Sequence, residues 1–567
     1  MTQKIFIIKS LFLAGMFSAQ SDFVSTTLNS KSSADISEIE TSSNPENLLV
    51  ADPQSLLIAT TGSVTVGTGG LLTLTNAATN FGTANNFTLE NDANLIQIKG
   101  TANTGNLLAK RNVIAIHNIP GVAVDYIYWS APVLGQQTKG AGGFSPGTPN
   151  NNFFDYRESN DRFYQTPDLT FVPAKGYAVR AENDQGQIYN RLFEFRGVPN
   201  NGDISIPITR SPNTGAQNNV IHGYNLVGNP YPSNIKFDVL YDGNAALIYK
   251  SIWFWTNATF TQYQQGSNYN GNNYAVYNGT GGNAASRDAA VPAATVKPNG
   301  IVKVGQGFLV QKRDFGTANL VFKNSYGTDK DLRVYAAGTF FSKDAQPKNR
   351  FTIQLTAPDN LVNSALIGYV SGATDQYEKD YDAEAFTVSA NLLYSVLDNR
   401  RLLIQGKSND FSTKDKVALG INFSQNGNYT INLNEAEGLF ENGQKVYLKD
   451  KQTRTITDLT EGSYTFTSDS GENNSRFEII YEPESVLATD DLSKEQIVVY
   501  RQNGDFVIKS PKEMNRIEIY ETSGKLIQNV KPNAKISVIQ SATLINGMYI
   551  LKIQTVDGAV VSKKIVR

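Results

Sequence analysis

Apolar and polar residues alternate along short runs over most of the chain, and Gly, Asn or Pro separate these runs. The pattern is clearest between about residues 336 and 482, in stretches such as "RFTIQLTA", "RLLIQGK", "NYTINLN" and "RFEIIYE". A period of two places side chains on alternate faces, which is typical of strands with one buried face. Several such strands at regular spacing predict an antiparallel β-sandwich. One stretch, Asp382 to Asp398, fits an amphipathic helix, although its β-branched residues also suit a strand.

Two further β regions precede this one. In residues 51–111 the runs "SVTV", "LLTL", "FTLE" and "LIQI" recur at intervals of about 8 to 16 residues, which predicts a short β-solenoid or a flat sandwich. Residues 112–335 form an aromatic, loop-rich β region. The predicted fold class is therefore all-β and multidomain.

The chain begins with features of a signal peptide. Lys4 precedes an apolar run from Ile5 to Phe17, which is too short to span a bilayer. No other window reaches about 18 consecutive apolar residues, so no transmembrane segment is predicted. The predicted organisation is a signal peptide (1–19), a linker (20–50), a solenoid-like segment (51–111), an aromatic β domain (112–335), a β-sandwich (336–482), a linker (483–495) and a C-terminal domain (496–567).

Composition excludes several kinds of chemistry. The chain has no Cys and two His, so thiolate catalysis and a histidine-rich zinc site are excluded. No Walker-type GK[ST] follows either GTGG stretch, Gly67 to Gly70 or Gly279 to Gly282, so these read as turns. The formal net charge of −2 gives no basic footprint for nucleic acid. We therefore expect a protein that is not an enzyme, has no cofactor and binds no nucleic acid.

Aromatic residues offer one candidate ligand site. Trp253 and Trp255 alternate on one predicted strand, so they share a face, and Tyr269 and Tyr274 follow in a stretch rich in Asn and Gly. Flat rings beside amides suit a glycan, because the rings stack on a sugar and the amides bond to its hydroxyls. The favoured interpretation is that the tryptophans fill the core and the tyrosines hold a loop. The alternative is a glycan-binding patch, with Tyr269 and Tyr274 as the candidate glycan contacts.

An acidic stretch offers a second candidate. Asp375, Asp380 and Asp382 lie close together in the sequence and carry oxygen ligands of the kind that Ca²⁺ prefers. Their spacing does not match an EF-hand loop, so a solvated turn is the favoured interpretation. Calcium is kept only as an alternative to the prediction of no metal.

The last 22 residues, "NGMYILKIQTVDGAVVSKKIVR", predict a hairpin that turns at Asp557-Gly558. A two-residue loop would pair Lys552 with Lys563. A register shifted by one, which we assign to a bulged three-residue loop, would set Ile550 against Val566 and pair Lys552 with Lys564. Like charges directly opposite each other are destabilising. The lysines are therefore predicted to contact a partner, and the alternative is that they protect an open edge strand from aggregation.

The same region resembles a known family. "IEIYETSGKLIQ" and the closing hairpin are similar to the type A C-terminal sorting domain of the type IX secretion system, which exported surface proteins of Bacteroidetes carry. "DYIYWSAPV", "YNLVGNPYPS" and "VGQGFLV" resemble segments of the ectodomains of such proteins. The residues that match the sorting domain are Gly524, Lys525, Gly547, Tyr549, Gly558, Lys563 and Lys564.

This resemblance implies an immunoglobulin-like C-terminal sandwich that the type IX translocon and its processing machinery recognise. It implies a secreted or extracellular protein, either released or attached to the outer-membrane surface. We expect a structural or adhesive role for the remainder of the chain, with a surface glycan as a candidate partner. The alternative is a secreted carbohydrate-binding protein or a polysaccharide-degrading enzyme.

Overall fold

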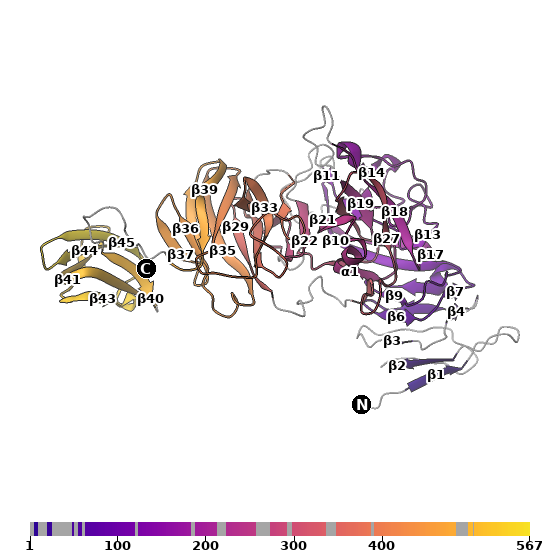
Figure 1. The fold of residues 1–567 in the computed structure, drawn as a ribbon, viewed down its shortest axis with the longest axis horizontal. Coiled ribbons are helices and arrows are strands. Elements are labelled where there is room, and N and C mark those ends of the chain that lie inside the picture. Colours follow the sequence, from indigo (N-terminus) through magenta and orange to yellow (C-terminus); the bar gives the residue numbers. More distant parts are fainter. Residues whose placement is uncertain are drawn as a thin grey trace. The chain divides into compact units, whose positions relative to one another are not determined.

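A computed structural model (Figure 1) confirms the all-β prediction. It describes residues 5–9, 20–24, 48–49, 55–58, 60, 63–119, 123–182, 188–212, 223–256, 273–291, 297–335, 348–386, 391–483, 497–502 and 504–567. Within these residues, one α-helix is present, α1 (Phe237–Asn244), and no helix is long and apolar enough to cross a membrane. The chain divides into two compact units, Met1–Pro483 and Glu484–Arg567.

Little of the predicted signal peptide and of the two linkers belongs to the described residues. Strand β1 (Ile5–Lys9) pairs antiparallel with β2 (Gln20–Val24), and β3 (Leu48–Leu49) ends the first linker region. The rest of residues 1–50, and residues 484–495, lie outside the part that the structure describes.

Residues 48–111 stack as parallel ladders, which is the solenoid arrangement. Strands β3 to β6 each pair with the third strand after them, and β8 pairs with β10, so the strands form three ladders. Apolar side chains such as Leu74, Leu89 and Leu95 fill the interior. The ladders are β3–β6–β9, β4–β7 and β5–β8–β10, built from β4 (Leu56–Ile58), β5 (Val64–Val66), β6 (Leu71–Leu74), β7 (Ala78–Asn80), β8 (Phe87–Leu89), β9 (Asn94–Gln97) and β10 (Leu107–Ile119).

The aromatic region that follows is built from small antiparallel sheets. One has the order β19–β26–β21–β22–β23, and its strand β21 (Ile248–Trp255) carries both tryptophans. Trp253 and Trp255 belong to one apolar cluster, so they do share a face. The other strands of this sheet are β19 (Tyr224–Gly228), β22 (Tyr274–Asn278), β23 (Gly282–Asn283) and β26 (Gly307–Lys312).

Residues 349–480 contribute most of one 12-stranded sheet with the path β37–β36–β39–β34–β32–β33–β30–β29–β35–β38. Its strands include β29 (Asn349–Thr356), β30 (Leu361–Tyr369), β33 (Arg400–Lys407), β34 (Lys416–Phe423), β35 (Gly427–Glu437), β37 (Thr455–Asp458) and β39 (Gly471–Ile480). Its two ends meet through side chains, because the Tyr464 hydroxyl on β38 (Tyr464–Ser468) donates to Asp450 on β36 (Tyr447–Asp450) at 2.8 Å. The helix considered for Asp382 to Asp398 is wrong for the part described. Residues Leu392–Leu397 form β32, a strand buried mainly on both faces, where β-branched and large apolar residues fit well.

The C-terminal unit is a small sandwich organised by one long strand, β41 (Asp505–Glu521). Its first part pairs with β40 (Val498–Gln502) and β43 (Ala534–Ile539). Its second part pairs with β42 (Leu526–Val530) and β44 (Met548–Thr555), and β45 (Val560–Val566) completes that sheet. Twelve buried side chains from Ile497 to Ile565 form the core between the two parts.

Both registers predicted for the closing hairpin are wrong. The loop has three residues, Val556 to Gly558, because Thr555 N–H donates to Ala559 O at 2.9 Å. Gly558 has φ +86°, the left-handed conformation that this loop type requires. Lys552 consequently lies opposite Ser562, and no lysine faces another lysine across the pair.

Candidate functional site

Four of the seven residues considered for a sorting signal serve the fold of the C-terminal unit. Tyr549 is buried in the core, and its hydroxyl donates to Ile545 O at 2.8 Å, which holds the turn before β44. Gly547 exchanges backbone hydrogen bonds with Arg567, so the last residue is tied to the sheet. Gly524 and Gly558 occupy turns with positive φ.

The other three residues are basic and reach the surface. Lys525 and Lys564 are exposed, and Lys563 is half-buried at the edge strand β45. They belong to a basic domain: residues 497–567 contain eleven Lys or Arg and five Asp or Glu, a formal charge of +6 in a chain whose total is −2. A positive domain attached to an acidic remainder attracts partners with negative surfaces.

Exposed apolar side chains are concentrated in the same unit. Among the described residues, 21 large apolar side chains are exposed, and 12 of them lie between Val498 and Val566. Soluble monomers rarely expose contiguous apolar surface, and patches of this kind mark interaction sites. The concentration therefore distinguishes this unit from the larger one.

Strand pairing shows that several of these side chains form one surface. Tyr500 lies opposite Val507, which lies opposite Val538. In the adjoining row, Val498 and Ile536 flank Lys509. Directly paired residues share a face, and these lie on the side opposite Phe506 and Ile508, which point into the core. We call this surface the outer patch: Val498, Tyr500, Lys509, Ile536 and Val538, with the buried Val507 (5 % exposed) on the central strand between Tyr500 and Val538.

The outer face of the second sheet mixes the same two properties. Tyr520, Ile550 and Lys564 lie side by side across β41, β44 and β45. Beyond them, the exposed Met548 lies opposite the exposed Val566. A basic and apolar character is thus shared by both faces of the C-terminal unit.

Sequence reasoning missed the outer patch. In β43, Ile536 and Val538 point outward while Ser537 and Ile539 point inward, the reverse of what the polarity of Ser537 suggests. When apolar residues occupy both odd and even positions of a strand, the sequence does not show which face is buried. The register of β43 against β41 was needed to identify the exposed surface.

The predicted glycan contacts are placed only in part. Tyr269 lies outside the described residues. Tyr274 is half-buried, its hydroxyl lies 2.7 Å from that of Tyr128, and its ring packs against Trp255 and Phe386 at centroid distances of 5.3 and 4.9 Å. Burial raises the pKa of Tyr274 above its ordinary value. In this structure Tyr274 serves an aromatic cluster.

The three acidic residues considered for calcium each have a separate protein partner. Asp375 pairs with Lys407 at 2.6 Å, and Asp380 pairs with Arg313 at 2.7 Å. Asp382 accepts the N–H groups of Glu378 and Gly406 at 2.6 and 2.9 Å. Within the described residues, no group of three or more acidic or histidine side chains is arranged to hold a metal ion.

Comparison with known families matches residues 29–481 to a model described as a domain of unknown function (DUF8693). The chain belongs to the DUF8693 family. Residues 487–567 of this DUF8693 protein match a second model, also described as a domain of unknown function (DUF8694). A search of curated proteins finds no match. The boundary between the two matched regions lies close to the division between the compact units at Pro483 and Glu484.

Proposed function

We propose that this DUF8693 protein is an exported structural or adhesive protein, and that its C-terminal unit is the sorting signal for the type IX secretion system. The translocon and its processing machinery are the partners of that unit. The mature protein is secreted, and it is either released or held at the outer-membrane surface.

The observation that carries this proposal is the basic and apolar surface of the C-terminal unit. Twelve exposed apolar side chains and a formal charge of +6 within residues 497–567 suit docking to an acidic partner with apolar surface. The resemblance of "IEIYETSGKLIQ" and of the closing hairpin to sorting domains supports the identity of that partner. The predicted repulsion between hairpin lysines does not support the sorting proposal, because in the observed register no lysine lies opposite another lysine.

A reporter fusion tests whether the unit is sufficient. Residues 484–567 are fused to a periplasm-tolerant fluorescent protein that carries its own signal peptide, in a host with a type IX system. We expect fluorescence in the medium or on the cell surface. A fusion that folds but stays in the periplasm contradicts the proposal.

Two variants with equal charge change identify the surface that is recognised. Lys563→Gln with Lys564→Gln alters β45, whereas Lys531→Gln with Lys535→Gln removes the same charge elsewhere on the unit, at two exposed positions. We expect the first pair to reduce export of the fusion and the second to leave it nearly unchanged. If the β45 lysines only protect an edge strand, the first pair will aggregate while its soluble fraction is exported normally.

A further inference from the structure

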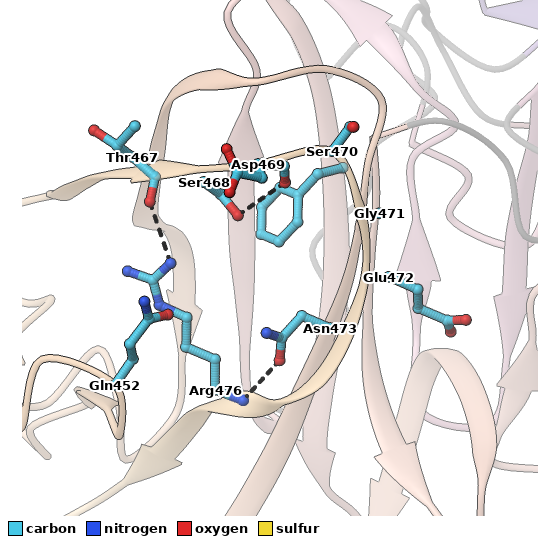
Figure 2. A pocket seen from close by; sticks show the side chains of 10 residues that line it. Gln452, Thr467, Ser468, Asp469, Ser470, Gly471, Glu472, Asn473 and Arg476 are labelled. Atoms are coloured by element: carbon cyan, nitrogen blue, oxygen red, sulfur yellow. Dashed lines mark hydrogen bonds between the residues drawn. The ribbon is translucent and has the colours of Figure 1, made fainter.

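A polar groove lies at one end of the 12-stranded sheet, where β38 connects to β39 (Gly471–Ile480). Its volume of about 330 Å³ is at the lower end of the range of roughly 300 to 1,000 Å³ that is usual for small-molecule sites. Figure 2 shows the connection from Thr467 to Asn473 above and beside it, with Gln452 and Arg476 at its lower side. Phe423 adds an apolar ring to the lining.

Arg476 is a rigid wall of this groove. Its side chain is 6 % exposed, and its Nη2 donates to the Asp450 carboxylate, itself 1 % exposed, at 2.8 Å. The guanidinium lies against the rings of Phe466 and Phe477, at 4.7 and 4.8 Å from their centroids. Because Asp450 neutralises it, Arg476 gives the groove shape and a fixed position instead of free positive charge.

The backbone around the groove is held by side chains. The pairing of β39 with β34 (Lys416–Phe423) is irregular between Asn473 and Phe477, and the extra residues bulge outward. Asn473 Oδ1 accepts the N–H groups of Ser475 and Arg476 at 3.1 and 3.0 Å, which fixes the bulge. Asn426 Oδ1 accepts Ser470 N–H at 2.8 Å and fixes the connection. A site held in this way loses little entropy when a ligand binds.

The two acidic residues at the groove differ in their freedom. Glu472 is engaged by Arg401 at 2.7 Å and by Tyr394 at 2.6 Å, and in Figure 2 its side chain lies across the strand from Gln452 and Arg476. Asp469 is exposed and makes no ion pair within the described part of the chain. Asp469 therefore contributes the free carboxylate of the groove, and the lining also includes the Gln452 amide and the Ser470 hydroxyl.

We propose that this groove binds a neutral glycan. Every hydroxyl of a sugar both donates and accepts, and a groove lining that offers a carboxylate, an amide and a hydroxyl matches that pattern. Asp469 accepts from sugar hydroxyls, and Gln452 both donates and accepts. An acidic sugar is disfavoured because its carboxylate would approach Asp469. The site is distinct from Tyr269 and Tyr274. Glycan binding is measured with the purified chain, so its outcome does not depend on whether the proposed export is correct.

The full-length protein is tested by titration calorimetry against neutral tetrasaccharides of glucose, mannose, xylose and N-acetylglucosamine, with an oligouronate of equal length as the acidic comparator. We expect at least one neutral tetrasaccharide to bind and the oligouronate to bind more weakly. Asp469→Ala should weaken binding about tenfold, the usual effect of losing a hydrogen bond to a charged group. Asp469→Asn, which keeps a hydrogen-bonding side chain of the same shape, should weaken it less.

Asp410→Ala is the matched control, because Asp410 is an exposed acidic loop residue in the same unit and does not line the groove. It should bind as the wild type does. The proposal is overturned if no neutral tetrasaccharide binds, if the oligouronate binds as tightly, if Asp469→Ala has no effect, or if both alanine variants lose binding equally.

Discussion

Individual charged residues differ widely in what they contribute, and burial decides the difference. Arg476 and Asp450 form a buried ion pair with Tyr464 as a third partner, whereas Arg401 and Glu472 are paired near the surface. The contacts of Arg476 hold the pKa of Asp450 below its ordinary value even though burial acts in the opposite direction. Removing one member of a buried pair leaves an uncompensated charge, whereas removing one member of an exposed pair costs little.

Arg476→Ala should therefore lower the free energy of unfolding of the larger unit by about 3 to 5 kcal/mol. Arg401→Ala should lower it by about 1 kcal/mol or less. Urea denaturation of the two variants beside the wild type measures the difference. Equal losses for the two arginines would show that the buried pair has no special role.

Asp382 gives a prediction about pH. It is 2 % exposed, and burial, with Glu378 and Glu384 nearby, raises its pKa to about 7 although two backbone N–H groups bond to it. A carboxyl whose folded pKa is raised stabilises the fold fully below its unfolded pKa of about 3.9 and loses that stabilisation as the pH rises through about 7. The melting temperature of the wild type relative to Asp382→Asn should therefore fall between about pH 4 and about pH 8. A constant difference across this range would contradict the assignment.

At the scale of elements, the sequence predicted strands better than it predicted their pairing. Alternation correctly indicated β structure between residues 349 and 480. The short runs at 51–111 indicated a solenoid or a flat sandwich, and the parallel ladders correspond to the first of these. The helix considered for Asp382 to Asp398 was wrong because Leu392–Leu397 is a strand buried mainly on both faces. Such a run shows neither a helical nor a strand period, so the pattern cannot distinguish the two. The predicted register of the closing hairpin was wrong because adding or removing one loop residue changes the cross-strand partner of every residue in both strands.

The observed register predicts a specific coupling in the closing hairpin. Ser562 lies opposite Lys552, so Ser562→Glu should create an attractive cross-strand pair worth about 0.2 to 1 kcal/mol. A double-mutant cycle with Lys552→Ala, followed by urea denaturation of the C-terminal unit, measures this coupling. Lys563→Glu in the same cycle is the control, and a larger coupling there would favour the two-residue loop.

The candidate surface could be predicted only in part. The sequence indicated Lys525, Lys563 and Lys564 as surface residues of a C-terminal domain, and the structure leaves these lysines exposed or half-exposed. The sequence did not indicate that Val498, Tyr500, Ile536 or Val538 lie at the surface, because an apolar residue in a strand is ordinarily assigned to the core. Only the pairing of β40, β41 and β43 shows that they lie on an outer face.

At the scale of the whole molecule, the two units differ in chemistry and in their cores. The core of the C-terminal unit is built from its own residues, from Ile497 to Ile565. Residues 484–567 alone should therefore unfold in one cooperative transition, with a stability of about 3 to 5 kcal/mol, typical of a domain of this size. Circular dichroism during thermal unfolding tests this, and a spectrum without strand signal at low temperature would contradict it.

The central claim is that the C-terminal unit directs the chain out of the cell. The most direct test measures the extracellular fraction of the full-length protein and of a chain that ends at Pro483, both expressed in one host with a type IX system. We expect the full-length protein to reach the surface or the medium and the truncated chain to accumulate, folded, in the periplasm. Equal export of the two chains would contradict it.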